Sequence, residues 1–191
     1  MWERFWETSA LKLPALIWLV AFIGFSVLPM PRALAGEDII SLAKDPAYLT
    51  VSGGYFDYIR GNDTGGEISL EYRSDYQLGW FKPFAHAAYV TNGMTFLGAG
   101  LLLDVKVGEN WIVQPSFAPT WWRGKSGQFD LDLGSALEFR SRLEVAYRFE
   151  NKSRLGVSIT HTSNGGFEDT NPGTEAVMLN VSVPTTFFTR P

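Results

Sequence analysis

The residues best suited to do chemistry lie in one short stretch near the end of the chain. His161 and Ser163 are separated by a single residue, and an imidazole beside a hydroxyl is a common basis for nucleophilic catalysis. In a β-strand, residues two apart point to the same side at about 6.6 Å along the chain, so the two groups can meet. The spacing predicts Ser163 as a nucleophile and His161 as its general base and acid.

A third polar group has the matching direction. In the alternation, Glu175 points to the same side of its strand as the apolar residues that follow it. His161 and Ser163 likewise point to the same side as the apolar residues that precede them. Those apolar residues are Leu155, Val157, Ile159, Val177, Leu179, Val181 and Val183. An acid, a base and a nucleophile are therefore expected on one otherwise apolar surface. Polar groups on such a surface are costly and indicate function. Glu175 would orient the imidazole and stabilise its protonated form.

Other assignments of the same residues stay open. Glu168 or Asp169, in the loop before Glu175, could replace it as the orienting acid. His161 and Ser163 could also be ordinary residues at the rim of a sheet, since the pattern His-x-Ser is common. Directly after Ser163, Asn164 and the backbone amides around Gly165 and Gly166 could donate hydrogen bonds to an oxyanion, because glycine permits close approach.

The remaining chemistry is restricted by composition. The other histidine, His86, is flanked by alanines and is expected to be a structural strand residue. With two isolated histidines and no cysteine, the chain has no thiol nucleophile and no disulfide, and neither a transition-metal site nor a cofactor is expected. The 20 acidic and 16 basic residues give a net charge of −4, which argues against nucleic acid binding.

The same composition indicates a β-rich chain. Of the 191 residues, 15% are aromatic, 19% are charged and 19 are glycine, which fits neither a disordered chain nor a helical bundle. Residues 13–28 are uncharged and apolar, basic residues precede them, and Ala33-Leu34-Ala35 follows. This pattern predicts a signal peptide over residues 1–35, cleaved after Ala35, and a mature domain over residues 36–191. An uncleaved membrane anchor is the alternative.

Within that domain, apolar and polar residues alternate with the period of two that is typical of strands. The clearest case is residues 135–150, where apolar residues alternate with charged ones. The expected strands are 48–60, 67–75, 81–91, 95–107, 111–122, 135–150, 154–163 and 175–183. Pro115 and Pro119 are expected to disturb pairing in the fifth strand, because proline has no N–H to donate.

Eight strands joined by turns after an export signal predict an all-β, antiparallel, up-and-down barrel. Aromatic residues near strand ends and opposite charges on the other face favour a transmembrane barrel with its apolar face outward. A soluble lipocalin-like carrier with an apolar lumen would show the same alternation inverted.

The chain resembles the PagL type of lipid A 3-O-deacylases. The resemblance rests on His161-Thr162-Ser163-Asn164-Gly165-Gly166, on Asn171-Pro172-Gly173-Thr174-Glu175 and on Gly53-Gly54-Tyr55-Phe56-Asp57. It implies an eight-stranded barrel of the bacterial outer membrane that removes the 3-linked hydroxyacyl chain from lipid A in lipopolysaccharide. It also implies His161, Ser163 and Glu175 as the triad, with Asn164 and Gly166 in the oxyanion hole.

The sequence departs from such barrels at its end. They usually end on an aromatic residue that assists insertion, whereas residues 184–191 read Pro-Thr-Thr-Phe-Phe-Thr-Arg-Pro. The leading hypothesis is an outer membrane serine esterase acting on lipid A. The alternatives are a non-enzymatic structural or adhesive barrel and a secreted lipocalin-like carrier. A homodimer is left open as the assembly state.

Overall fold

A computed structural model describes residues 40–124 and 133–189 of the chain. The predicted signal peptide, residues 1–35, lies outside the described residues. The strands are β1 (Ile40–Leu42), β2 (Tyr48–Phe56), β3 (Gly65–Arg73), β4 (Phe81–Val90), β5 (Thr95–Leu103), β6 (Val105–Val107), β7 (Trp111–Arg123), β8 (Leu137–Arg148), β9 (Arg154–Ser163) and β10 (Thr174–Pro184), and they are followed by the short helix α3 (Thr186–Thr189).

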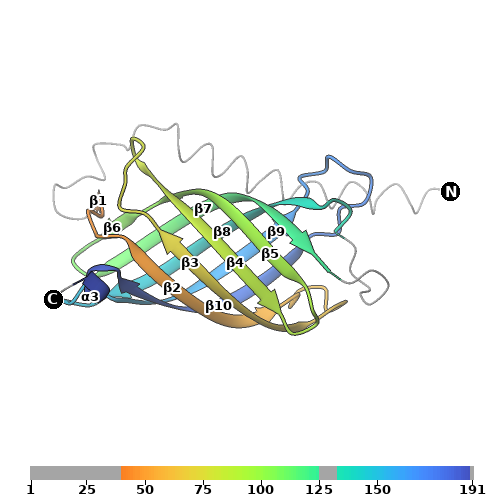
Figure 1. Cartoon of the computed structure of the whole chain (residues 1–191), viewed down its shortest axis with the longest axis horizontal. Helices are drawn as coiled ribbons and strands as arrows, with labels where there is room; N and C mark the ends of the chain where they lie inside the picture. The colour runs from red at the N-terminus through yellow and green to blue at the C-terminus, as the bar shows by residue number, and fades with distance from the viewer. Residues whose placement is uncertain (1–39, 125–132, 190–191) are drawn as a thin grey trace.

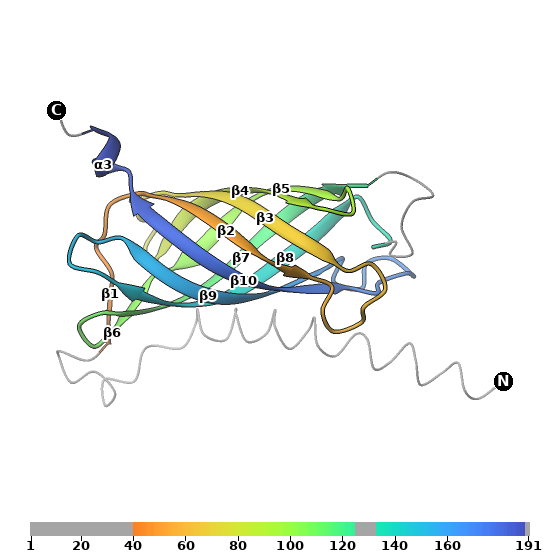
Figure 2. The same cartoon turned by 90° about the horizontal axis from the view of Figure 1, so that it is seen from below.

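The long strands close into one antiparallel barrel (Figure 1 and Figure 2). Each of the strands β2, β3, β4, β5, β7, β8, β9 and β10 pairs with the next in that order. β10 then pairs back onto β2, from Ala176 opposite Phe56 to Pro184 opposite Tyr48. The eight-stranded, up-and-down barrel predicted from the alternation is confirmed.

The predicted strand over residues 95–107 is present as two segments, β5 and β6. Both pair with β7 in one continuous register, and the break between them lies beside Pro115. A second gap, at Ala99 and Gly100, lies opposite Pro119. Because proline has no N–H to donate, each proline interrupts the ladder on the β5 side. On its other side β7 pairs with β8 from Trp111 to Trp121.

The outer surface of the barrel is apolar. Among the described residues, large hydrophobic side chains on every long strand are exposed, including Val51, Ile68, Leu70, Tyr72, Tyr89, Leu97, Leu101, Trp121, Leu137, Val145, Leu155, Val157, Ile159, Val177, Leu179 and Val181. Aromatic rings gather near strand ends, where Trp111 and Tyr147 pack edge to face at 5.6 Å between ring centroids. An apolar band with aromatic rims fits a bilayer and contradicts the soluble carrier with an apolar lumen.

The middle of the barrel interior is charged and paired. Arg73 donates to Glu71 at 2.5 Å and to Glu144 at 2.6 Å, and Arg142 donates to Glu71 at 2.7 Å. All of these groups are almost inaccessible to solvent. Buried charges require such partners, because removal from water costs several kcal/mol per ion. The inward polar residues of the alternation therefore pair across the barrel.

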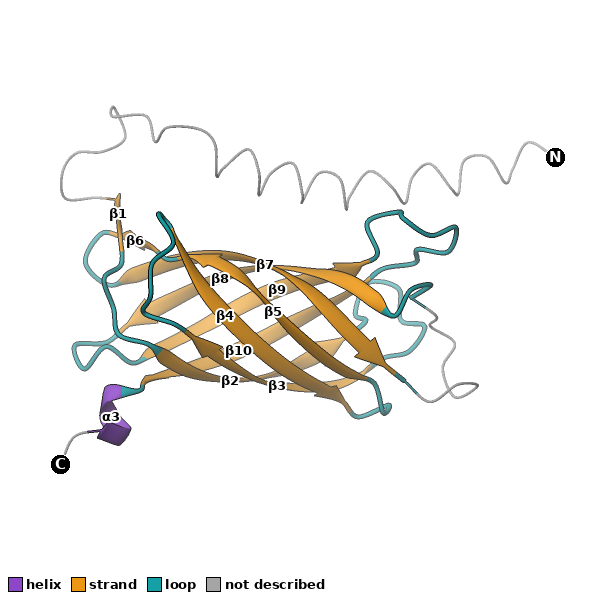
Figure 3. Cartoon of the chain, turned by 45° about the horizontal axis from the view of Figure 1, so that its top comes forward, coloured by secondary structure: helices purple, strands orange, loops and turns teal. Residues whose placement is uncertain are grey.

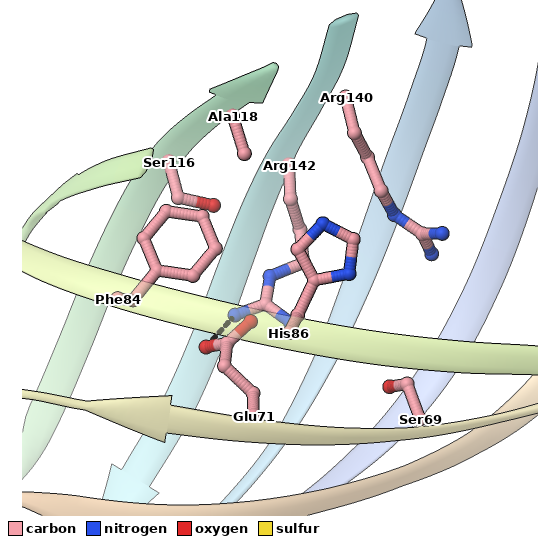
Figure 4. A pocket seen from close by; sticks show the side chains of 8 residues that line it. All are labelled: Ser69, Glu71, Phe84, His86, Ser116, Ala118, Arg140 and Arg142. Carbon is pink, nitrogen blue, oxygen red and sulfur yellow. Dashed lines mark hydrogen bonds and ion pairs between the residues drawn. The ribbon is translucent and has the colours of Figure 1, made fainter. Parts of the chain in front are cut away.

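A small cavity lies within this network and holds His86 (Figure 4). It is lined by Ser69, Glu71, Phe84, His86, Ser116, Ala118, Arg140 and Arg142. The His86 ring stacks on Phe84 and its Nε2 lies 3.1 Å from the hydroxyl of Thr120. His86 therefore occupies a buried position inside the barrel, on the opposite side of the wall from the outward-facing residues.

One end of the interior is apolar rather than charged. A buried cluster there comprises Phe56, Ala88, Val90, Met94, Phe96, Leu133, Ala176 and Met178. Leu133, from the segment between β7 and β8, is fully buried in this cluster. The sequence predicted opposite charges on the inner face, and this end differs because apolar side chains of several strands and of a loop pack together there.

The opposite end is closed by the segment before β2. Arg154 donates to Asp45 and to Asp104, each at 2.7 Å, and Lys82 donates to the carbonyl of Ala43 at 2.9 Å. β1 pairs with β6 at this end. α3 also lies here, while the loop between β9 and β10 lies at the far end (Figure 3).

The chain after β10 forms α3, which carries two exposed aromatic side chains. Phe187 and Phe188 are accessible, and Thr185 donates its N–H to the carbonyl of Ala47 at 2.8 Å. Phe187 and Phe188 thus follow shortly after a residue that is bonded to the end of the barrel. No helix in the described ranges is long and apolar enough to span a membrane.

Candidate active site

His161 and Glu175 form a hydrogen-bonded pair on the outer surface of the barrel. They are direct partners in the register of β9 and β10, and His161 Nδ1 lies 2.9 Å from Glu175 Oε1. A carboxylate only accepts, so Nδ1 carries a proton and donates it to Glu175, while Nε2 is buried without a hydrogen-bond partner among the described residues. The side chains are 14% and 16% exposed, which places the pair partly out of water. The predicted pairing of a base with this acid is present.

Ser163 ends β9 two residues after His161, and it is buried. Its partner in the register with β8 is Phe139. Within the described residues, no hydrogen bond joins its hydroxyl to His161, and His161 Nε2 is buried without a hydrogen-bond partner. Catalytic hydrogen bonds often become short only when substrate is bound. The structure therefore brings His161 and Glu175 together and leaves Nε2 of His161 without a hydrogen-bond partner.

The alternative acids do not replace Glu175. Glu168 and Asp169 are both exposed on the loop between β9 and β10, and neither bonds to His161. Glu175 is held to the ring by strand pairing, whereas these residues lie on a loop. The strand position explains why Glu175 is the residue that meets the imidazole.

Asn164 connects the loops that surround Ser163. Its side-chain amide donates to the carbonyl of Leu133 at 3.1 Å and to the carbonyl of Thr170 at 2.7 Å. Its Oδ1 accepts from the N–H of Gly166 at 2.9 Å, and its own N–H donates to Asn171 Oδ1 at 3.1 Å. The predicted oxyanion donors, Asn164 and Gly166, are therefore bonded to protein acceptors in this structure, and Asn164 holds two loops together.

Asp57 is a residue near the site that the alternation did not identify. It is fully buried and has a φ of 56°, which is uncommon for a residue other than glycine. Its N–H donates to the carbonyl of Glu175 at 2.7 Å, and its carboxylate accepts from the hydroxyl of Thr174 and the N–H of Asp63. Asp57 thus ties the loop after β2 to the first residues of β10.

Asp57 closes the motif Gly53-Gly54-Tyr55-Phe56-Asp57, but the signal for its backbone conformation is its residue type. Aspartate tolerates the left-handed backbone and hydrogen-bonds nearby amides, so an aspartate directly after a strand predicts a tight turn. This turn also ends β2 at Phe56, four residues before the predicted end at Arg60. Sequence alone did not indicate that the turn would contact the strand that carries Glu175.

No metal centre is present in the part of the chain that the structure describes. The described histidine, aspartate and glutamate residues form no group of three that could hold an ion. An imidazole, a carboxylate and a hydroxyl together suit proton transfer and acyl transfer.

Comparison of the sequence with known proteins points to one family. A family model described as "Lipid A 3-O-deacylase (PagL)" matches residues 58–184. The protein "Lipid A deacylase PagL" of Pseudomonas aeruginosa is 36% identical over 55 residues, which are 29% of this chain and 32% of that protein. The aligned part thus spans about a third of this curated relative.

The fold is similar to a solved enzyme. The crystal structure of the outer membrane enzyme PagL superposes with a TM-score of 0.55 at 20% identity, covering 72% of this chain and 99% of the other. At this identity the likeness shows the shared barrel fold. The family match, in contrast, extends over well over half of the 191 residues and includes His161, Ser163 and Glu175. The chain belongs to the PagL family of lipid A 3-O-deacylases.

Proposed function

We propose that this protein is a serine esterase of the bacterial outer membrane that hydrolyses the ester of the 3-hydroxyacyl chain at position 3 of lipid A. Membership of the PagL family supports the substrate. The observation that carries the proposal is the His161–Glu175 pair, which faces outward in line with exposed Val157 and Ile159. A lipid substrate would reach this pair from the bilayer without entering the barrel.

The end of the barrel at which the pair lies supports the outer leaflet. Outer membrane barrels have longer loops on the extracellular side. The two longest connections between barrel strands join β7 to β8, from Arg123 to Leu137, and β9 to β10, from Ser163 to Thr174. The strand ends that they join lie at the end of the barrel that carries Ser163. The described chain begins at β1 and ends at α3 on the opposite, periplasmic side (Figure 1). Lipid A of the outer leaflet is then level with the site.

The first half of the reaction forms an acyl-enzyme. Ser163 Oγ attacks the ester carbonyl carbon and passes its proton to His161 Nε2, while Glu175 stabilises the imidazolium through Nδ1. The tetrahedral intermediate then collapses, and the bond between the carbonyl carbon and the sugar oxygen breaks. His161 returns the proton to that oxygen, which leaves a free hydroxyl at position 3 and the acyl chain on Ser163.

The second half regenerates the enzyme. Water attacks the acyl carbonyl as His161 takes one of its protons, and the proton then passes to Ser163 Oγ as the free 3-hydroxy fatty acid leaves. The imidazole acts as base and then as acid in each half, which requires Nε2 to be free of other partners. That nitrogen has no hydrogen-bond partner in the described structure.

Oxyanion stabilisation is assigned to Asn164 and Gly166. Donors on this loop lie directly after the nucleophile, and one such donor typically contributes about 10²–10³ in rate. Because both residues are bonded to protein acceptors, the oxyanion would replace one of them, for example Asn171 Oδ1 at the N–H of Asn164. This exchange needs a small movement of the loop and no change in the barrel.

Hydrolysis by the purified protein tests the proposal. The folded wild type and Ser163→Ala are incubated in detergent with lipopolysaccharide, and released fatty acids are identified by mass spectrometry. We expect the wild type to release 3-hydroxy fatty acid and Ser163→Ala to release none above background. A non-enzymatic barrel is the second candidate, because Ser163 and His161 are not hydrogen-bonded to each other. If neither protein releases fatty acid, the result favours a non-enzymatic barrel.

A further inference from the structure

Gly173 lies against the ring of His161. It is buried in the loop just before β10 and has a φ of +66°. A Cβ atom at this position would lie 3.0 Å from His161 Cε1, 3.6 Å from Nε2 and 3.5 Å from the carbonyl oxygen of Thr162. The first distance is tighter than an ordinary van der Waals contact, so a side chain here would displace either the ring or the loop.

The contact lies on the side of the ring that the reaction uses. Glu175 holds His161 through Nδ1, while Cε1 and Nε2 face Gly173. Nε2 is the nitrogen that would exchange a proton with Ser163, and it is buried with no partner. The imidazole is thus fixed between a carboxylate on one edge and glycine backbone near the other.

We propose that Gly173 is a positioning residue for His161, because its lack of a side chain sets the tilt of the ring and leaves room at Nε2 for the serine hydroxyl and the ester. The inference rests on the proposed function, in which Nε2 moves the proton. A Cβ at position 173 would push the ring away from the line between Glu175 and Ser163. Proton transfer depends steeply on such geometry, since misplacement by about 1 Å can cost 10²-fold.

Backbone conformation is a separate reason for glycine at this position. A φ of +66° disfavours any residue with a Cβ, wherever it occurs. The chain offers matched glycines that isolate this effect. Gly79 and Gly108 have φ values of +64° and +62°, lie in turns at the periplasmic end, and have no atom within 4 Å of a built Cβ. Alanine at these two positions has the same backbone strain without any contact with the site.

The experiment compares Gly173→Ala with Gly79→Ala and Gly108→Ala in the full-length protein, folded in detergent. Thermal unfolding midpoints are measured with kcat and KM for lipopolysaccharide deacylation and with the rate of Ser163 labelling by a fluorophosphonate. We expect similar shifts in midpoint for the three variants. Only Gly173→Ala should lose at least tenfold in kcat and in labelling rate, with KM within about twofold of the wild type.

Gly173→Asn separates the effect of the Cβ contact with His161 from the effect of backbone strain. It also replaces Gly173→Ala in the test if that variant fails to fold. Asparagine tolerates positive φ but still has a Cβ, so we expect near-normal stability with a kcat as low as that of the alanine variant. Full activity of either folded variant would overturn the role of Gly173. These results can be distinguished from failure of the proposed function, in which the wild type and Ser163→Ala would not differ.

Discussion

His161 and Glu175 face each other across two neighbouring strands, with Nδ1 and Oε1 2.9 Å apart. The strand ladder on both sides sets their separation, because Thr174 lies opposite Thr162 and Ala176 opposite Thr160. A slip of one residue would move Glu175 to the inside of the barrel, since strand side chains alternate. The register of the barrel thus sets which carboxylate holds the imidazole.

Replacing the acid tests this orientation. Glu175→Gln keeps the size of the side chain but removes the charge that stabilises the imidazolium, so we expect kcat to fall by about 10²–10⁴-fold. The fall in kcat is measured as the rate of lipopolysaccharide deacylation by the folded protein. Glu168→Gln and Asp169→Asn are the matched controls, because both carboxylates lie exposed on the loop. Loss of activity in a control but not in Glu175→Gln would reassign the acid.

Removing the side chain of Asn164 should disconnect the loops at the site. Asn164→Ala deletes the bonds to the carbonyls of Leu133 and Thr170, and with them the side-chain amide as an oxyanion donor, but it keeps the main-chain N–H. We expect kcat to fall by about 10²–10³-fold, and proteolytic cleavage between β7 and β8 to become faster. Asn151→Ala, in the turn between β8 and β9, is the control. Wild-type rates for Asn164→Ala would exclude both roles.

Asp57 should act on Glu175 through the main chain. Asp57→Ala removes the carboxylate that accepts hydrogen bonds from Thr174 and Asp63. It also places alanine, which lacks a polar side chain to stabilise this conformation, at a positive φ. We expect unfolding to become easier by about 1–3 kcal/mol and kcat to fall. Asp57→Asn can keep one acceptor and adopt the same φ, so it should recover most of both. If Asp57→Asn and Asp57→Ala behave alike, the hydrogen bonds are not what matters.

The buried charges inside the barrel should affect stability alone. Glu144→Gln leaves Arg73 and Arg142 to share Glu71, and breaking a buried ion pair on one side costs about 3–5 kcal/mol. Unfolding of the barrel by guanidinium, followed by tryptophan fluorescence, measures this loss. The specific activity of the folded fraction should stay at the wild-type value, because the site is on the other side of the wall. A fall in kcat without a fall in stability would place Glu144 in the reaction.

Much of the barrel could be predicted from the sequence, because strand alternation is a local property. The parity of residues 135–150 and 154–163 identified the apolar face, and the same parity placed His161 and Glu175 on it. The prolines also acted as expected, since Pro115 and Pro119 lie beside the two gaps in the ladder of β7.

Features that depend on contacts between distant segments could not be predicted. The apolar cluster inside one end of the barrel needs Leu133 from a loop to meet strand residues such as Phe96. The side-chain amide of Asn164 donates hydrogen bonds to carbonyls 31 and 6 residues away along the chain, and no periodic sequence pattern encodes such contacts. Gly173 was visible only as part of a motif, and its contact with His161 depends on how the loop returns to the barrel.

The most direct test of the central claim is the mass of lipid A from cells that produce the wild type or Ser163→Ala. Both proteins must be shown as folded barrels in the outer membrane, with Ser153→Ala in a turn at the other end as the active control. Loss of one 3-hydroxyacyl chain in the wild type and Ser153→Ala, but not in Ser163→Ala, is the predicted result. The same loss in cells with folded Ser163→Ala would contradict Ser163 as the nucleophile.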